Sequence, residues 1–169
     1  MIFNSDRFGA LTIDPKDLIE FPAGLIGFPN DNTFILLRQR EGSPIAWLHS
    51  TTNPSLAFPV ISLEALSVEY PEADILRAAE VSGISGSLDS FSVMLVFAAP
   101  GKDIPPTVNL VAPIVVNAET RSGAQILLEG TRLSACEPLS TWLAEPAPQP
   151  QPAARARRTT EVQIAMDEP

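Results

Sequence analysis

The sequence predicts a mainly β protein: a small antiparallel, barrel-like domain with one or two short helices. Three observations lead to this prediction. Short apolar runs recur at intervals of about 8 to 15 residues with Pro and Gly between them, which is typical of a closed or sandwiched antiparallel sheet. Only one segment shows clear helical spacing. The hydrophobic content of 45% is enough to build one core in a chain of 169 residues.

The expected strands are residues 10–13, 18–21, 34–37, 45–48, 57–61, 92–99, 107–111, 114–116 and 125–129. The strongest is 92–99, because it is rich in Val and Phe and apolar on both faces. Pro59 lies inside the run 57–61 and cannot donate a ladder hydrogen bond, so we expect that strand at an edge or a bulge. Pro113 separates two of the runs, and its peptide bond can be cis or trans.

The clearest helix is predicted over residues 70–81. Pro71 suits the first helical position, and Glu72 and Asp74 lie where the helix dipole favours negative charge. Gly83 is a plausible C-terminal stop. The residues at helical spacing on its packing face are Ile75, Ala78, Ala79 and Ser82. A second helical turn is expected within 134–143, where Trp142 needs a surface to pack on.

Composition places a domain boundary near Ala144, giving a folded domain of residues 1–144 and a tail of 145–169. Four prolines alternate with Ala and Gln at the start of the tail, and three arginines follow. This composition predicts a disordered tail, with a tether or partner-binding segment as the alternative. Within it, residues 162–166 (VQIAM) suit a short docking strand or a helical turn.

The charge of the chain excludes several classes of protein. The net charge is −9 with only two lysines, which argues against direct nucleic-acid binding. The expected domain carries 16 acidic and 8 basic side chains, so nearly all of the acidity belongs to its folded part. One Cys and one His exclude an internal disulfide framework and the common zinc sites. No secretory signal or run long enough to span a membrane is visible, so the expected location is the cytoplasm.

No catalytic constellation is visible in the sequence. His49 is the one candidate base, but no G-x-S-x-G motif accompanies it, and its place at a strand end suits a surface rim equally well. Cys136 lacks partners for nucleophilic chemistry, and no phosphate-binding glycine loop occurs. The acidic residues around Glu72 are explained by a helix start. We therefore predict a non-enzymatic, acidic binding domain without metal or cofactor.

Several segments, taken in order along the chain, are similar to one family. The two most specific are residues 21–28 (FPAGLIGF) and residues 109–117 (NLVAPIVVN). The others are RFG at 7–9, FILL at 34–37, WLHS at 47–50, PSLAF at 54–58 and GAQILL at 123–128. Together they cover residues 3 to about 130, and the chain resembles the FliW family of bacterial flagellar assembly factors. It departs from that pattern at His49, where relatives usually have Gln, and in its long tail.

The resemblance implies a small β-barrel-like fold in the cytoplasm and two protein partners. These are flagellin and the RNA-binding translational regulator CsrA. We expect the protein to be a monomer. Proteins of this family bind CsrA and relieve its repression of flagellin translation. Flagellin competes with CsrA by binding the FliW-type protein. An alternative function is that of a flagellin-only chaperone or adaptor without any effect on CsrA.

The candidate partner-binding residues come from these motifs: Phe21, Leu25, Ile26, Phe28, Trp47, Asn109 and Asn117. Gly24 and Gly27 permit a tight path, with φ above zero, that projects apolar side chains from a loop. The four apolar residues of that loop either plug the end of the barrel or form an exposed patch for a partner. Asn109 and Asn117 are expected to satisfy backbone groups at turns on either side of Pro113.

The acidity of the domain has a use in this setting. A CsrA-type protein must present a basic surface to hold RNA phosphates. A strongly negative domain docked beside that surface is expected to repel RNA through its local field, without occupying the RNA site.

Overall fold

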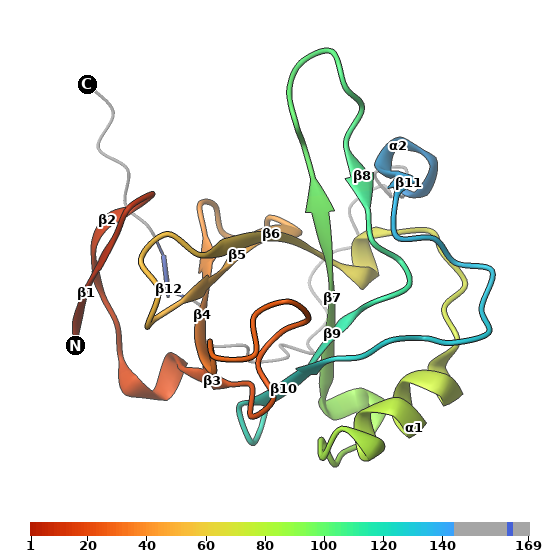
Figure 1. Cartoon of the computed structure of the whole chain (residues 1–169), viewed down its shortest axis with the longest axis horizontal. Coiled ribbons are helices and arrows are strands. Elements are labelled where there is room, and N and C mark those ends of the chain that lie inside the picture. The colour runs from red at the N-terminus through yellow and green to blue at the C-terminus, as the bar shows by residue number, and fades with distance from the viewer. Residues whose placement is uncertain (144–161, 164–169) are drawn as a thin grey trace, which may run out of the picture.

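The computed structural model describes residues 1–143 and 162–163, and its central feature is a closed β-barrel (Figure 1). Seven of the described strands form the ring: β3 (Ile19–Glu20), β4 (Thr33–Arg38), β5 (Ile45–Ser50), β6 (Ala57–Ser62), β7 (Phe91–Ala98), β9 (Ile114–Asn117) and β10 (Ser122–Gln125). The ring closes because β7 pairs with both β6 and β9. The predicted barrel-like β fold is confirmed.

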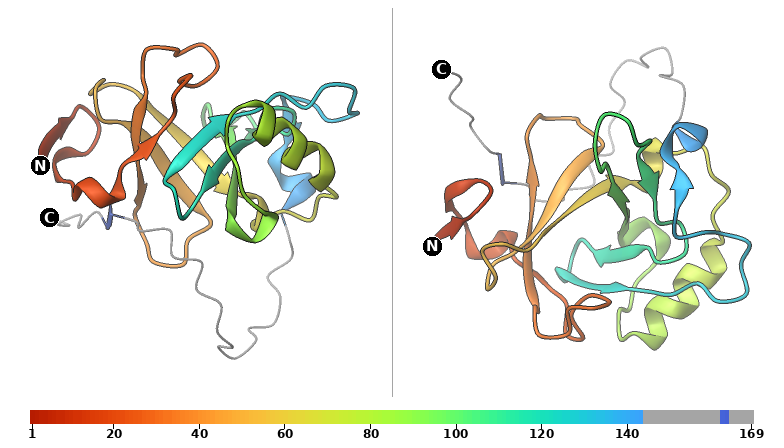
Figure 2. Two further views of the ribbon diagram at one scale, coloured as in Figure 1. Left: turned by 90° about the horizontal axis from the view of Figure 1, so that it is seen from below. Right: turned by 45° about the horizontal axis from the view of Figure 1, so that its top comes forward.

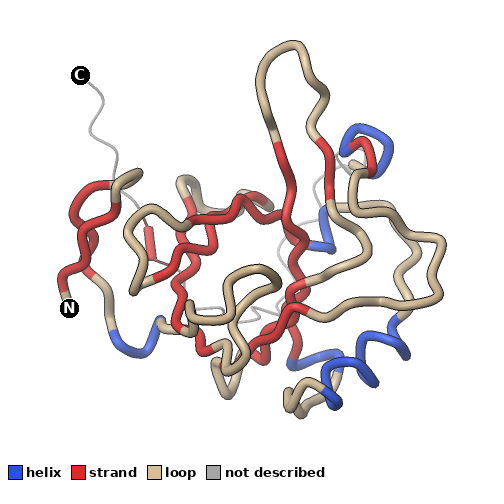
Figure 3. The backbone as a smooth tube through the Cα atoms, in the orientation of Figure 1, coloured by secondary structure: helices blue, strands red, loops and turns tan. Residues whose placement is uncertain are grey.

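The barrel interior is a continuous apolar core. Alternation along β4 directs Phe34 and Leu36 into this core, while Ile35 and Leu37 belong to a second cluster on the outer face. Both faces of β4 are therefore buried, as the uninterrupted apolar run in the sequence indicated. Figure 3 shows the strands as a ring, with the long loop between β3 and β4 lying across one open end.

The shortest strand pairing in the ring is its one parallel contact, where β10 meets β3 through the single pair Ser122 and Glu20. Arg121 strengthens this seam. Its Nη2 donates to the Asp17 carbonyl at 2.5 Å and its Nε to the Leu18 carbonyl at 3.3 Å, and its own carbonyl accepts from the Glu20 amide. Burial lowers the pKa of the Arg121 guanidinium. The seam holds the end of β3, from which the long loop departs.

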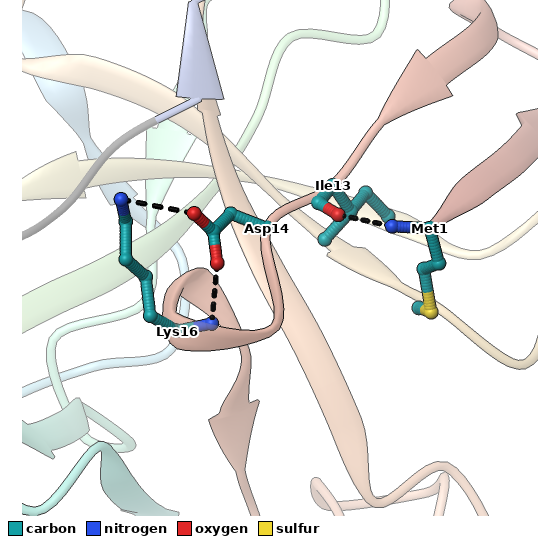
Figure 4. A network of polar contacts seen from close by, with 4 residues as sticks. All are labelled: Met1, Ile13, Asp14 and Lys16. Atoms are coloured by element: carbon teal, nitrogen blue, oxygen red, sulfur yellow. Dashed lines mark hydrogen bonds and ion pairs between the residues drawn. The ribbon is translucent and has the colours of Figure 1, made fainter.

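An N-terminal hairpin that the sequence analysis only half predicted covers the outer face of β4. It consists of β1 (Ile2–Ser5) and β2 (Gly9–Thr12), and the prediction missed β1, whose sequence mixes polar and apolar residues. The Met1 ammonium donates to the Ile13 carbonyl at 2.5 Å (Figure 4). Figure 4 also shows the ion pair between Lys16 and Asp14. That pair is largely exposed, so it contributes little to stability.

Helix α1 (Glu72–Val81) lies on the opposite side of the barrel from the hairpin, as Figures 1 and 2 both show. Ile75 and Ala79 are buried against the sheet, which confirms the predicted face, but Ser82 is exposed because the helix ends at Val81. Gly83 follows with φ of +80°, which confirms it as the stop. Pro71 is the residue before the helix, one position earlier than expected.

The predicted strand 125–129 is wrong in its bounds. The strand is β10, and residues 126–129 run beside the segment before β9, joined to it by the amides of Ile126 and Leu128 donating to the Pro113 and Val111 carbonyls. Pro113 is trans. Residues 126–129 alternate between buried and exposed, as a strand would, because one side of this segment packs under α1.

Pro59 has the role that its chemistry requires. Strand β6 lies between β5 and β7, so only part of it forms an edge. However, β7 pairs with β6 only from Val60 onward, and Pro59 faces β5 alone, opposite Trp47. The missing N–H therefore lies where no neighbour needs it.

A smaller lobe extends from the distal half of β7. There β8 (Thr107–Val108) pairs with β7 and with β11 (Glu137–Pro138), and the short helix α2 (Leu139–Trp142) follows. The predicted strand 107–111 and helix 134–143 are thus present in shortened form. Trp142 finds its expected surface in a cluster around Leu139.

The tail prediction falls mostly on residues outside those described. Residues 162–163 form β12 (Val162–Gln163), which pairs with β4. Among the described helices, none has the length and apolar character needed to cross a bilayer.

Candidate functional site

The loop between β3 and β4, residues 21–32, makes a tight turn at its centre. The Phe28 amide donates to the Leu25 carbonyl at 2.8 Å and the Leu25 amide to the Phe28 carbonyl at 3.3 Å. Ile26 and Gly27 form the end of this turn, with φ of +86° at Gly27 and +67° at Gly24. The predicted path with φ above zero is confirmed at both glycines.

This loop divides its apolar residues between two environments. Phe21 and Leu25 point into the barrel core, where they are 0% and 4% exposed. Ile26 and Phe28 lie on the outside, with 57% and 36% exposure. We call these two residues the hydrophobic tip. The interpretation that all four side chains plug the barrel is right for Phe21 and Leu25 and wrong for Ile26 and Phe28.

The loop is braced by residues from outside its turn. Asn32 Nδ2 donates to the Phe21 and Pro22 carbonyls at 3.0 and 3.1 Å. The Ile26 amide donates to Gln125 Oε1 at 3.0 Å, which ties the tip to strand β10. These bonds restrain the backbone that carries Ile26, which lowers the entropy that the loop would lose on binding a partner.

Gln125 and Phe58 support the tip, and the sequence analysis did not single out either residue for this role. Gln125 Nε2 also donates to the Ala112 carbonyl, which orients its side chain toward Ile26. The rings of Phe28 and Phe58 meet edge to face with centroids 5.2 Å apart. The glutamine lies 99 residues from its partner in the chain, so no local pattern could have revealed it.

Trp47 belongs to a different part of the molecule. It lies half-buried on the outer face of β5, in the cluster under the N-terminal hairpin. The Arg7 guanidinium lies 3.9 Å from the centre of the Trp47 ring, a cation–π contact. The structure thus separates Trp47 from the core residues of the loop and gives it a packing partner.

His49 is fully buried, so the expectation of a surface rim is wrong. Its Nε2 lies 2.6 Å from Ser5 Oγ and its Nδ1 2.6 Å from the Ser50 carbonyl. Ser5 Oγ already accepts from the amides of Arg7 and Phe8, so its hydroxyl proton goes to Nε2 and the ring proton to Nδ1. Burial lowers the pKa of His49. A neutral imidazole thereby joins the hairpin to the barrel.

Asn109 and Asn117 serve the backbone, as expected. Asn109 Oδ1 accepts from the amides of Val111 and Ala112. Asn117 is 3% exposed; its Oδ1 accepts from the amides of Glu119 and Thr120, and its Nδ2 donates to the Ser85 carbonyl at 2.8 Å. These side chains hold turns at the two ends of the motif and are not grouped with the hydrophobic tip.

A second apolar feature lies between helix α1 and residues 125–129. It is a shallow groove beside which Val81 and Leu127 are 85% and 54% exposed. Asp74, Arg77 and Glu129 also line it. We call this feature the helix groove.

The acidity of the domain is a surface property. Of the 16 acidic side chains within residues 1–143, only Asp17 is buried. Within the same residues, no group of three or more His, Cys, Asp or Glu side chains is arranged to hold a metal ion. The described residues thus offer an apolar tip and an acidic exterior as binding surfaces.

Comparison with known proteins places these features in a family. A family model described as "FliW protein" matches residues 2–139. The flagellar assembly factor FliW of Bdellovibrio bacteriovorus is 30% identical over 165 residues, which cover 98% of this chain and 94% of that protein. The protein of the same name from Desulfitobacterium hafniense (strain Y51) is 35% identical over 136 residues, covering 79% and 88%.

A solved structure supports the same fold. The crystal structure of a flagellar assembly factor FliW superimposes with a TM-score of 0.67 at 23% identity, covering 82% of this chain and 96% of that one. The matched family region ends at residue 139, so β12 and the tail lie beyond it.

Proposed function

This chain belongs to the FliW family of flagellar assembly factors, and from that premise we propose that it binds the translational regulator CsrA. Binding relieves the repression that CsrA imposes on target mRNAs such as that of flagellin. Flagellin is the second partner and exchanges with CsrA, so that accumulated flagellin restores repression. The protein acts in the cytoplasm by changing partners, and no covalent bond is made or broken.

The observation that best supports a protein-binding role is the braced hydrophobic tip. An exposed Ile26 at 57% is held by a backbone hydrogen bond from a distant strand. Holding an apolar side chain in a fixed place reduces the conformational entropy lost on association. A few fully desolvated side chains carry most of the binding energy at protein interfaces, and we assign that role to Ile26.

The acidic exterior supports the effect on RNA. Sixteen acidic against eight basic side chains lie in residues 1–143, nearly all of the acids at the surface. Docked next to a basic RNA-binding protein, this domain lowers the local potential that attracts phosphates. RNA is then displaced by the field of the domain as well as by contact.

The experiment is a displacement assay with the full chain. Purified protein is added to CsrA bound to fluorescent flagellin leader RNA, and both RNA release and the protein complex are measured. We expect RNA release with formation of a stable complex, and reversal when flagellin is added. If the full chain bound CsrA yet released no RNA, or failed to bind it, the proposal would be overturned.

A charge variant separates docking from displacement. Glu20 and Glu119 are exposed and adjoin the β3–β10 seam at the base of the long loop. We expect the double variant Glu20→Gln, Glu119→Gln to weaken RNA release more than it weakens binding to CsrA, with a smaller difference at high salt. Equal RNA release by the native and neutralised proteins would contradict the role given to the field.

A flagellin-only chaperone is the second candidate, and the helix groove favours it. An amphipathic helix can lie in a groove through apolar residues on one face, here beside Val81 and Leu127. The acidic and basic side chains that also line the groove reduce its apolar area. Recovery of flagellin alone from cell extract, with no CsrA, would support this candidate over the first.

A further inference from the structure

Strand β4 has an edge that the barrel itself leaves open. On one side β4 pairs with β5 as far as Leu37. On the other side β3 covers only Thr33 and Phe34, because it is two residues long. The backbone from Ile35 to Arg38 therefore continues past the end of its β3 neighbour.

This stretch of backbone needs a partner. The side chains of Ile35 and Leu37 are both 0% exposed, under the N-terminal hairpin. Backbone N–H and C=O groups beside such a buried surface are costly to leave unpaired, and an uncovered strand edge invites another strand. In the structure, β12 occupies this position and runs parallel to β4, with Val162 opposite Leu37 and Gln163 opposite Arg38.

We propose that the β4 edge from Ile35 to Arg38 is a strand-addition site, and that its resident occupant is the C-terminal segment of the same chain. Strand addition uses main-chain hydrogen bonds for affinity, and alternating side chains give register. The sequence V-Q-I-A-M at 162–166 has that alternation, with Val, Ile and Met at every second position.

The length of the connecting segment favours occupation within one molecule. Residues 144–161 join the end of the described domain to β12. A chain of that length reaches on the order of 60 Å when extended, which is ample for a small domain. A connection of this length within one chain also gives an effective concentration on the order of millimolar, well above that of a second copy in solution.

The site has a consequence for other peptides. Any extended segment of a partner that adds to this edge must first displace Val162 and Gln163, so the tail sets a threshold for binding there. The edge and its occupant both belong to this chain, so the site is present whether or not CsrA or flagellin binds.

The first test measures hydrogen exchange in the full chain. The double variant Val162→Pro, Gln163→Pro removes two backbone donors from the tail and leaves the barrel sequence intact. We expect the amides of residues 35–38 that do not bond to β5 to exchange at least 10-fold faster than in the native chain. The matched control Ala153→Pro, Ala154→Pro adds two prolines elsewhere in the tail and should leave exchange unchanged.

The second test identifies the occupant by cross-linking. In a Cys136→Ser background, cysteines at Arg38 and Gln163 should form a disulfide within one molecule, faster than the off-register pair Arg38→Cys, Thr159→Cys. A covalent dimer as the main product would assign the strand to a second copy and overturn the occupant proposed. Unchanged exchange in the proline variant, or equal cross-linking by both pairs, would overturn the site itself.

Discussion

The two most specific sequence motifs of this protein differ in where they place their apolar side chains. In residues 21–28 of the long loop, the backbone is held by Asn32 and Gln125, and the apolar side chains divide between core and surface. In residues 109–117, Asn109 holds backbone amides within the motif, Asn117 holds backbone groups of residues 85, 119 and 120 beyond it, and the apolar residues of β9 are buried. The first motif therefore leaves apolar side chains at the surface, where a partner can reach them, whereas the second places the apolar side chains of β9 in the core.

The largest expected effect tests whether the braced loop is as rigid as this comparison requires. A Cβ added at Gly24 would lie 2.3 Å from the Phe28 carbonyl oxygen, and φ there is +67°. Both strain and overlap must be relieved by moving the loop, so we expect Gly24→Ala to lower the free energy of unfolding by about 3 to 4 kcal/mol. Urea denaturation measures this change.

Gly27→Ala is the matched control for that variant. Gly27 has φ of +86°, but a Cβ there meets no atom within 4 Å. The Gly27→Ala variant therefore loses free energy of unfolding only through its strained backbone conformation, by about 1 kcal/mol. Equal losses at the two glycines would mean that the contact with Phe28 is unimportant and that the loop adjusts freely.

The next effect concerns the motif of residues 109–117. Asn117→Ala removes three hydrogen bonds from a side chain that is 3% exposed, so water cannot replace them. We expect a loss of about 2 to 3 kcal/mol in the free energy of unfolding. Asn109→Ala, at a half-buried position with two longer bonds, should cost about 1 kcal/mol. If Asn109 proved the more costly, the account of the motif as a buried brace would be wrong.

The sequence predicted the barrel because its strands are encoded locally. Continuous apolar runs such as that in β4 marked strands buried on both faces, and Gly83 marked the end of the helix. Strand β1 was missed because its pattern is weak without the cluster that it covers. Residues 126–129 were misassigned because an apolar run does not show whether the adjacent chain segment forms a continuous ladder of backbone hydrogen bonds with it.

The site was less predictable, for a physical reason. Gly24 and Gly27 indicated a turn with φ above zero, but the sequence did not show which of the four apolar residues around them would be buried in the core. Which of them faces outward depends on Gln125, which reaches the Ile26 amide from 99 residues away. Likewise, the burial of His49 depends on Ser5 in a hairpin that the sequence did not fully predict.

His49 extends the comparison to a third motif segment, in which a buried residue serves the scaffold through its charge state. Burial keeps the folded-state pKa of His49 below its unfolded value of about 6.5. The unfolded chain therefore binds more protons below that pH. The stability that this residue contributes is complete above pH 6.5 and is lost as the pH falls toward the folded-state pKa.

The measurement compares the native chain with His49→Gln across pH 5 to 8. At neutral pH we expect the variant to lose about 1 kcal/mol, since an amide can retain only part of the geometry with Ser5 and Ser50. The difference in the free energy of unfolding between the two proteins should shrink as the pH falls below 6.5. A constant difference over this range would show that His49 does not titrate in the linked interval.

The smallest expected effect on stability decides what the exposed tip is for. Ile26 and Ile104 are both 57% exposed, the first on the braced loop and the second between β7 and β8. Replacing either by Ser should change the free energy of unfolding by no more than about 0.5 kcal/mol, because each already lies largely in water. If the tip is an anchor for a protein partner, only Ile26→Ser should weaken binding, by at least about 10-fold in titration calorimetry with CsrA. Loss of binding in both variants, or in neither, would remove the functional distinction between the braced loop and the rest of the surface, since the two side chains are of the same type and equally exposed.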